Sequence, residues 1–132
     1  MNEPVTLAVS ADGVARLTFN RPGALNAVNE EMMRGLYATV KRAVADPAVA
    51  VVVLNGAGEH FMAGGDIKEF RDHLKQPPDG RLALFRGMIE QWINPSIRTL
   101  RECRQPVIAQ VRGACAGFGF SLEYVHGIGL AL

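Results

Sequence analysis

The segment His60-Phe61-Met62-Ala63-Gly64-Gly65-Asp66-Ile67-Lys68-Glu69 decides the fold of this chain. It follows the apolar run of residues 49–54 and a turn at residues 55–58, and it leads into a helix that we expect to start at Asp66. Small residues between a strand and a helix let peptide N–H groups approach a ligand closely, and a helix N-terminus adds positive potential there. The segment therefore predicts a ligand site built from backbone amides.

A second segment of the same kind is Gly113-Ala114-Cys115-Ala116-Gly117-Phe118-Gly119-Phe120. It also follows an apolar run, and it is also rich in glycine and alanine. We predict that the two segments converge and that each offers one backbone N–H to one carbonyl oxygen. The glycine spacing in the second segment does not fit a dinucleotide-binding fingerprint, and the sequence contains no Gly-Lys-Ser/Thr phosphate loop.

Composition excludes several classes of protein. A length of 132 residues with 48% hydrophobic residues predicts one globular domain. A net charge of +1 gives no electrostatic reason to expect nucleic acid or an anionic membrane as partner. Cys103 and Cys115 fit no metal or redox spacing, so we expect reduced thiols, no metal site and a cytoplasmic location. The N-terminus does not resemble a secretion signal, and no apolar run reaches the ~20 residues of a membrane span.

The first half of the chain predicts a hairpin, a helix and a buried strand. Val5–Val9 and Val14–Phe19 flank Asp12-Gly13, a pair that favours a tight turn. Asn29 is the expected N-cap of an amphipathic helix that ends before Asp46-Pro47. Residues 49–54 are apolar on both faces, as in a central strand.

The second half predicts three further elements. A short helix over residues 66–75 precedes a break at residues 76–80, and a longer helix follows over residues 81–100, with Pro95 interrupting or kinking it. A strand then covers Val107–Val111. The alternation of strands and helices indicates an α/β architecture.

Three motifs resemble those of the crotonase family, the enoyl-CoA hydratase/isomerase superfamily. They are Arg21-Pro22-Gly23-Ala24-Leu25-Asn26-Ala27, Phe61-Met62-Ala63-Gly64-Gly65-Asp66-Ile67-Lys68-Glu69, and Pro106 to Gly113 running into Gly117-Phe118-Gly119. The resemblance covers about residues 5–122 of a single domain spanning residues 1–132, and it leaves residues 123–132 as an atypical tail. It implies the ββα spiral core of the N-terminal part of a longer family member, incomplete at the C-terminus.

The same resemblance implies an acyl-CoA-binding protein of fatty acid metabolism, a lyase or isomerase that stabilises a thioester enolate. Its oxyanion-hole donors would be the backbone N–H groups of Ala63 and Phe118. Peptide groups at such positions must come within about 3 Å of the oxygen whose charge grows in the transition state. Coenzyme A would be part of the substrate, without a further cofactor, and the chain would form a trimer or hexamer. The implied substrate contacts are Gly23, Ala24, Leu25, Ala63, Gly64, Gly65, Asp66, Gly117 and Phe118.

The chain departs from the family at Ser121, where hydratases carry a glutamate three residues after the second donor. A serine cannot replace that acid/base without an activating partner. Ser121 could donate a hydrogen bond to substrate, hold a water, or fill space with its hydroxyl bonded to the carbonyl one turn back. Glu123 would lie on a different helix face.

The tail from Glu123 to Leu132 also departs from the family, because Gly127 and Gly129 weaken an expected helix by ~1 kcal/mol each relative to alanine. This favours a coding sequence truncated or frameshifted near residue 122; the alternative is a natural end completed by association. Three functions stay open: an enoyl-CoA hydratase/isomerase-like enzyme, a non-catalytic acyl-CoA-binding or assembly module, and an inactive truncated fragment.

Overall fold

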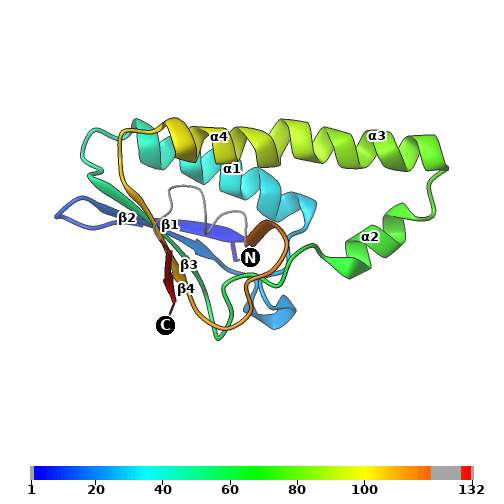
Figure 1. The fold of residues 1–132 in the computed structure, drawn as a ribbon, viewed down its shortest axis with the longest axis horizontal. Coiled ribbons are helices and arrows are strands. Elements are labelled where there is room, and N and C mark those ends of the chain that lie inside the picture. The colour runs from blue at the N-terminus through cyan, green and yellow to red at the C-terminus, as the bar shows by residue number, and fades with distance from the viewer. Residues whose placement is uncertain (1, 120–128, 132) are drawn as a thin grey trace.

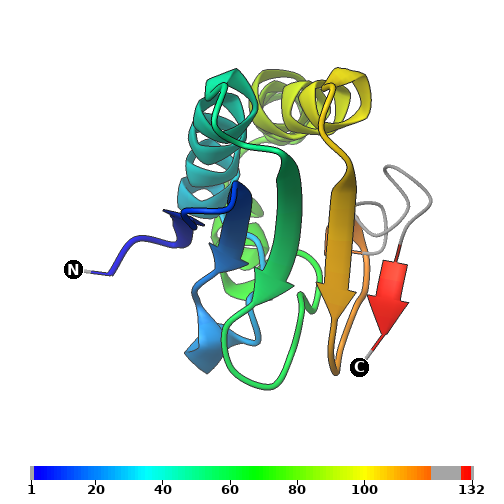
Figure 2. The same ribbon diagram turned by 90° about the vertical axis from the view of Figure 1, so that its left-hand side faces the viewer.

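The computed structural model describes residues 2–119 and 129–131. One five-stranded sheet runs through this part of the chain, with strand order β1-β2-β3-β4-β5 (Figure 2). β1 and β2 are antiparallel, and every later pairing is parallel. The strands are β1 (Val5–Val9), β2 (Val14–Phe19), β3 (Val51–Gly56), β4 (Val107–Val111) and β5 (Gly129–Ala131). The mixed sheet with its helices confirms the predicted α/β class.

The helices connect the strands and lie mainly over one face of the sheet. α1 contacts β1, β2 and α4, and α3 continues through a π-helical turn into α4 as one long rod along the upper edge of Figure 1. The helical elements are η1 (Pro22–Ala24), α1 (Glu30–Ala45), α2 (Ile67–His73), α3 (Pro78–Met88), η2 (Ile89–Ile93) and α4 (Asn94–Glu102). No helix of the described ranges is both long and apolar enough to cross a membrane.

In the first half of the chain, the predicted hairpin turn and the predicted helix start are both present. Gly13 has a φ of +89°, a backbone conformation that glycine adopts without strain, and it turns the β1–β2 hairpin. The Asn29 side chain accepts a hydrogen bond from the Met32 N–H at 2.9 Å, which confirms Asn29 as the N-cap of α1.

Two predicted boundaries are wrong by a few residues. β3 starts at Val51 and runs through Asn55 and Gly56, which the sequence placed in a turn, because both pair with β2 and the Thr18 hydroxyl donates to Asn55 Oδ1 at 2.7 Å. The break predicted over residues 76–80 is shorter, since α3 already begins at Pro78. A proline at the first position of a helix loses no intrahelical hydrogen bond.

The core lies between α1 and the sheet. The strand residues that alternate towards α1 are fully or almost fully buried, and Leu36 and Val40 of α1 are 1% and 0% exposed. Pro95 stands in the first turn of α4, directly after the π-helical turn, as the predicted interruption of the long helix requires. This core holds the carboxyl ends of β2, β3 and β4 at one edge of the sheet, where the candidate site lies.

The tail is only partly described. Gly129–Ala131 form β5, which pairs in parallel with residues 109–111 of β4, so these three residues join the sheet rather than extend a helix. Ser121, Glu123 and Gly127 lie outside the described residues.

Candidate functional site

The two glycine-rich segments lie side by side at the carboxyl ends of the strands. The N–H of Phe61 donates to the carbonyl of Arg112 at 2.7 Å, and the N–H of Met62 donates to that of Ala114 at 3.0 Å. In return, the N–H of Ala116 donates to the carbonyl of Met62 at 3.0 Å. The predicted convergence of the two segments is therefore confirmed.

The remaining motif, residues 21–27 with the adjoining Val28, lies along the other side of residues 60–66. The N–H of Val28 donates to the carbonyl of Gly64 at 2.8 Å, and the N–H of Asp66 donates to that of Val28 at 2.9 Å. Residues 21–28, 60–66 and 112–119 thus form a three-segment junction in which residues 60–66 are central. Tertiary structure brings together the three motifs that are far apart in the sequence.

The first predicted donor, Ala63, is already engaged. Its N–H donates to the carbonyl of Leu25 at 3.1 Å, so it is not directed at an open position in this structure. Leu25 has a φ of +55° at the end of η1, and this turn places its carbonyl against the central segment. Leu25 was predicted as a CoA contact; here its carbonyl holds Ala63, and its side chain is 49% exposed.

Several other amides of the junction have no such partner among the described residues, and those of Gly65 and Phe118 are among them. Across residues 2–119 and 129–131, the N–H groups of Gly65 and Phe118 donate to no described atom. The chain takes a helical conformation from Phe118, whose amide therefore lies ahead of the first turn. Gly65 was predicted as a substrate contact only. The sequence could not indicate that its amide is unengaged, because that depends on which neighbouring amide donates to the carbonyl of Leu25.

Close backbone contacts explain the glycines. A Cβ on Gly117, which has a φ of +56°, would lie 3.3 Å from the Cα of Gly64. A Cβ on Gly113 would lie 2.2 Å from the carbonyl oxygen of Glu59. Side chains at these positions would push the two segments apart, so the small residues set how closely the amides of the junction approach.

A buried asparagine that sequence reasoning did not single out connects the junction. Asn26 is 0% exposed and has a φ of +54°, a left-handed conformation that asparagine tolerates. Its Oδ1 accepts from the Arg21 N–H at 2.8 Å, and its Nδ2 donates to the carbonyls of Ala57 at 3.0 Å and His60 at 2.8 Å. The only available sequence signal was an asparagine in a turn, which is too common to assign a role.

An ion pair closes the same junction. Arg21 Nη2 lies 3.0 Å from Asp66 Oδ2, and the Arg21 guanidinium also donates to the carbonyl of Ala27. Asp66 Oδ1 caps α2 by accepting from the N–H groups of Lys68 and Glu69. Asp66 therefore holds the loop and the helix together.

The pKa of Asp66 reflects these contacts. Burial acts to raise the pKa and is the largest single influence. The hydrogen bond from Arg21, the N–H of Glu69, the charge of Arg21 and the N–H of Lys68 together outweigh burial and hold the pKa below its ordinary value of 3.8. Asp66 thus serves as a fixed anion at neutral pH, not as a proton donor.

Other polar side chains at the junction are also engaged in structural contacts. Glu69 Oε1 accepts from the N–H of Glu30 at 2.9 Å, at the start of α1. His60 Nδ1 accepts from the N–H of Ala114 at 2.9 Å, so this histidine joins two segments of the junction. Ser121 lies outside the described residues. Within the ranges that are described, no three His, Cys, Asp or Glu side chains form a group that could hold a metal ion.

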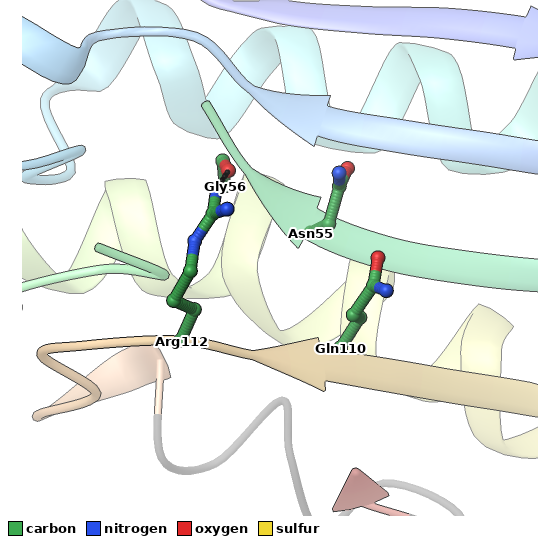
Figure 3. Close-up of a pocket in the computed structure, with 4 residues that line it drawn as sticks. All are labelled: Asn55, Gly56, Gln110 and Arg112. Atoms are coloured by element: carbon green, nitrogen blue, oxygen red, sulfur yellow. Dashed lines mark hydrogen bonds between the residues drawn. The ribbon is translucent and has the colours of Figure 1, made fainter. Parts of the chain in front are cut away.

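A small cavity of about 100 Å³ lies beside the junction, lined by Asn55, Gly56, Gln110 and Arg112 (Figure 3). Its polar groups are largely satisfied. Gln110 Oε1 accepts from Arg16 at 2.9 Å, and Arg112 donates to the carbonyls of Gly56 and Gly58. Arg112 therefore fastens the loop after β3 to the end of β4.

Comparison with known proteins gives the same family in sequence and in structure. Residues 10–130 match the enoyl-CoA hydratase/isomerase family. A probable enoyl-CoA hydratase of Mycobacterium tuberculosis is 35% identical over 98% of this chain and 47% of its own length. The hydroxycinnamoyl-CoA hydratase-lyase of Pseudomonas fluorescens is 36% identical over 83% of this chain and 39% of its own length.

Solved structures agree. A crystal structure of an enoyl-CoA hydratase/isomerase from Mycobacterium abscessus superimposes with a TM-score of 0.87 at 31% identity, covering 96% of this chain and 47% of that one. The chain spans about half the length of the curated relatives that it matches. Its core sheet, its three-segment junction and these matches together place the chain in the enoyl-CoA hydratase/isomerase family, the crotonase family.

Proposed function

We propose that this chain supplies the acyl-CoA-binding part of a crotonase-type site and that two backbone amides stabilise the negative charge on the thioester oxygen as an enolate forms. One observation carries the proposal. The N–H groups of Gly65 and Phe118 belong to two segments fastened side by side, and neither donates to a described atom. One preorganised donor of this kind is worth about 3 kcal/mol of transition-state stabilisation.

The structure favours Gly65 over Ala63 as the first donor. Ala63 would have to break its 3.1 Å hydrogen bond to Leu25 before it could donate to a ligand, whereas Gly65 would not. The carbonyl of Leu25 would then lose this hydrogen bond, which costs about 0.5–1.5 kcal/mol. Phe118 is retained from the sequence-based prediction.

The proposal for the remaining part of the substrate rests on the similarity to the enoyl-CoA hydratase/isomerase family. The relatives are named for enoyl-CoA and hydroxycinnamoyl-CoA chemistry, so coenzyme A is proposed as part of the substrate. Gly23, Ala24 and Leu25 would contact it from the turn at η1, together with Gly64, Asp66 and Gly117 from the junction. A cytoplasmic location, a place in fatty acid metabolism and a trimer or hexamer belong to the same proposal.

A second candidate is acyl-CoA binding without turnover. The carboxylates of Asp66 and Glu69, which lie at the junction, are both held in structural contacts. Asp66 is the one carboxylate within residues 21–28, 60–66 and 112–119, and its contacts with Arg21 and α2 leave it no proton to give. Turnover would need an acid or base from outside these three segments, whereas binding would not.

Calorimetry with two ligands tests the proposed amide site. Acetyl-CoA carries the thioester oxygen, and the thioether S-ethyl-CoA lacks it but is otherwise matched. We expect acetyl-CoA to bind roughly three- to tenfold tighter, the value of one or two net hydrogen bonds. Equal binding of the two ligands would refute the amide site while leaving CoA recognition intact.

A pair of variants at Phe118 tests which atom is responsible. Phe118→Pro removes the N–H at a helical start, where proline is tolerated, and Phe118→Ala removes the ring but keeps the N–H. The proline variant should lose the preference for acetyl-CoA over S-ethyl-CoA, and the alanine variant should keep it. The reverse pattern would assign the preference to the side chain.

A further inference from the structure

An aromatic ring lies directly over the proposed donor Gly65. A Cβ built on Gly65 would come within 2.4 Å of both Cε2 and Cζ of Phe70. The ring of Phe70, in α2, therefore packs on the Gly65 backbone. An acyl chain whose carbonyl oxygen reached the Gly65 amide would lie close to this ring.

Phe70 is one member of a cluster of three rings, Phe70, His73 and Phe85, called here the α2–α3 aromatic cluster. Phe70 and Phe85 meet edge to face with centroids 5.1 Å apart, and His73 and Phe85 do so at 5.4 Å. Phe70 and His73 are tilted at 6.5 Å. The three side chains are all half-buried, so each ring keeps accessible surface.

The main hydrophobic core does not account for this cluster. α2 contributes no buried residue, and of the two phenylalanines only Phe85 packs against the core. Aromatic side chains that a fold does not bury, next to a candidate ligand site, are available to a ligand.

A buried nitrogen in the cluster also lacks a partner. His73 Nδ1 is shielded from solvent, and it makes no hydrogen bond to any atom in the described part of the chain. Buried polar atoms are nearly always satisfied, and an unsatisfied one in a cluster beside a site indicates a missing partner. A neutral imidazole nitrogen can donate or accept one hydrogen bond, so a ligand hydroxyl can serve it in either tautomer once the half-buried ring turns this nitrogen towards the ligand.

We propose that the α2–α3 aromatic cluster is the acyl-recognition surface and that it selects aryl-substituted acyl thioesters, with His73 as the partner of a ring hydroxyl. This inference rests on the proposed function, because it places the thioester carbonyl at Gly65. Phe70 borders the acyl chain next to the carbonyl, and His73 and Phe85 continue the surface. An aryl group gains edge-to-face contacts there that a flexible alkyl chain cannot make.

Binding measurements on the full chain test the selection. Calorimetry compares 3-phenylpropanoyl-CoA with hexanoyl-CoA, two saturated thioesters that differ in the aryl group. We expect the aryl thioester to bind roughly three- to tenfold tighter, the range of one aromatic pair. Phe70→Leu should reduce this ratio to about one, and Tyr37→Leu, whose ring instead contacts Trp92 and Lys41, should not change it.

A third ligand tests His73. In the native chain, 3-(4-hydroxyphenyl)propanoyl-CoA should bind tighter than its phenyl counterpart, and His73→Phe should remove that gain while keeping the preference for an aryl group. Circular dichroism checks that each variant is folded.

The outcomes separate the two proposals. An unchanged aryl ratio in folded Phe70→Leu, or equal binding of aryl and alkyl thioesters by the native chain, overturns the inference alone. No binding of either thioester overturns the proposed function, and the inference with it.

Discussion

At the scale of single residues, the junction depends on polar side chains that hold backbone in place. Arg21, Asn26 and Asp66 each make at least two side-chain contacts with neighbouring groups of the protein, and each connects its own segment to another. These side chains therefore fix the positions of the peptide groups in the junction.

Asp66→Asn isolates the ion pair, because asparagine also caps a helix well. We expect the variant to lose about 1–2 kcal/mol of unfolding free energy at pH 7, the worth of a charge-assisted hydrogen bond that is partly buried. The side chains of Arg21 and Asp66 are 23% and 13% exposed. Urea denaturation measures the loss, and Asp72→Asn, an exposed surface pair, is the control with a loss below about 0.5 kcal/mol.

The same pair predicts a pH dependence. The pKa of Asp66 is lower in the folded chain than its ordinary value of 3.8, so the stabilisation is present above pH 3.8 and disappears as the pH falls through the folded pKa. The stability difference between the native chain and Asp66→Asn should therefore shrink below pH 3.8. A difference that stays constant down to pH 2 would show that the carboxylate charge contributes nothing.

Asn26→Ala should be more severe. It leaves two part-buried carbonyls and one N–H without their partners, and it places alanine, which adopts the left-handed conformation less readily than asparagine, at a φ of +54°. We expect a loss of about 3–5 kcal/mol in chemical denaturation. Asn26→Gly relieves the backbone strain but not the lost hydrogen bonds, so its smaller loss measures the hydrogen bonds alone.

At the scale of elements, glycines set the distance between the two segments. Gly113→Ala would bring a Cβ to 2.2 Å from the backbone oxygen of Glu59 at a φ of +63°. We expect a loss of at least about 2 kcal/mol, because backbone cannot move aside as a side chain can. Gly87→Ala, in α3 with no atom within 4 Å, is the matched control and should stabilise the chain by about 0.5–1 kcal/mol. Thermal unfolding should show a lower melting temperature for Gly113→Ala and a higher one for Gly87→Ala.

At the scale of the whole molecule, apolar side chains remain exposed along α2 and α3. Ile67, Leu74 and Leu82 are 72%, 60% and 61% exposed, and α2 buries none of its residues. Large exposed apolar patches favour association. Replacing all three residues by glutamine should lower the fluorescence of bound ANS and reduce any oligomer seen by sedimentation, with little change in unfolding free energy. Val9→Gln, a single exposed residue on the hairpin, should change neither reading.

The sequence by itself determined the class of fold and most of its elements, because those depend on short-range signals. Asp12-Gly13 predicts the hairpin, Asn29 predicts the start of α1, and Pro95 predicts an interruption of regular α-helix, which the structure has as the π-helical turn before α4. It also determined the family, since three motifs in the right order are specific even when each is weak alone. The sequence did not predict boundaries such as the end of β3, because pairing with β2 extends the strand through residues that favour a turn.

Only the tertiary structure decided which atoms of the site are free. The sequence indicated amides at Ala63 and Phe118, but the turn at Leu25 satisfies the first of these and leaves the amide of Gly65 open. The structure likewise placed Phe70 over Gly65 and joined it to Phe85, fifteen residues further along the chain. Such partners lie far apart in sequence, and which of them meet depends on how the loops pack, so no local pattern of residue types could specify them.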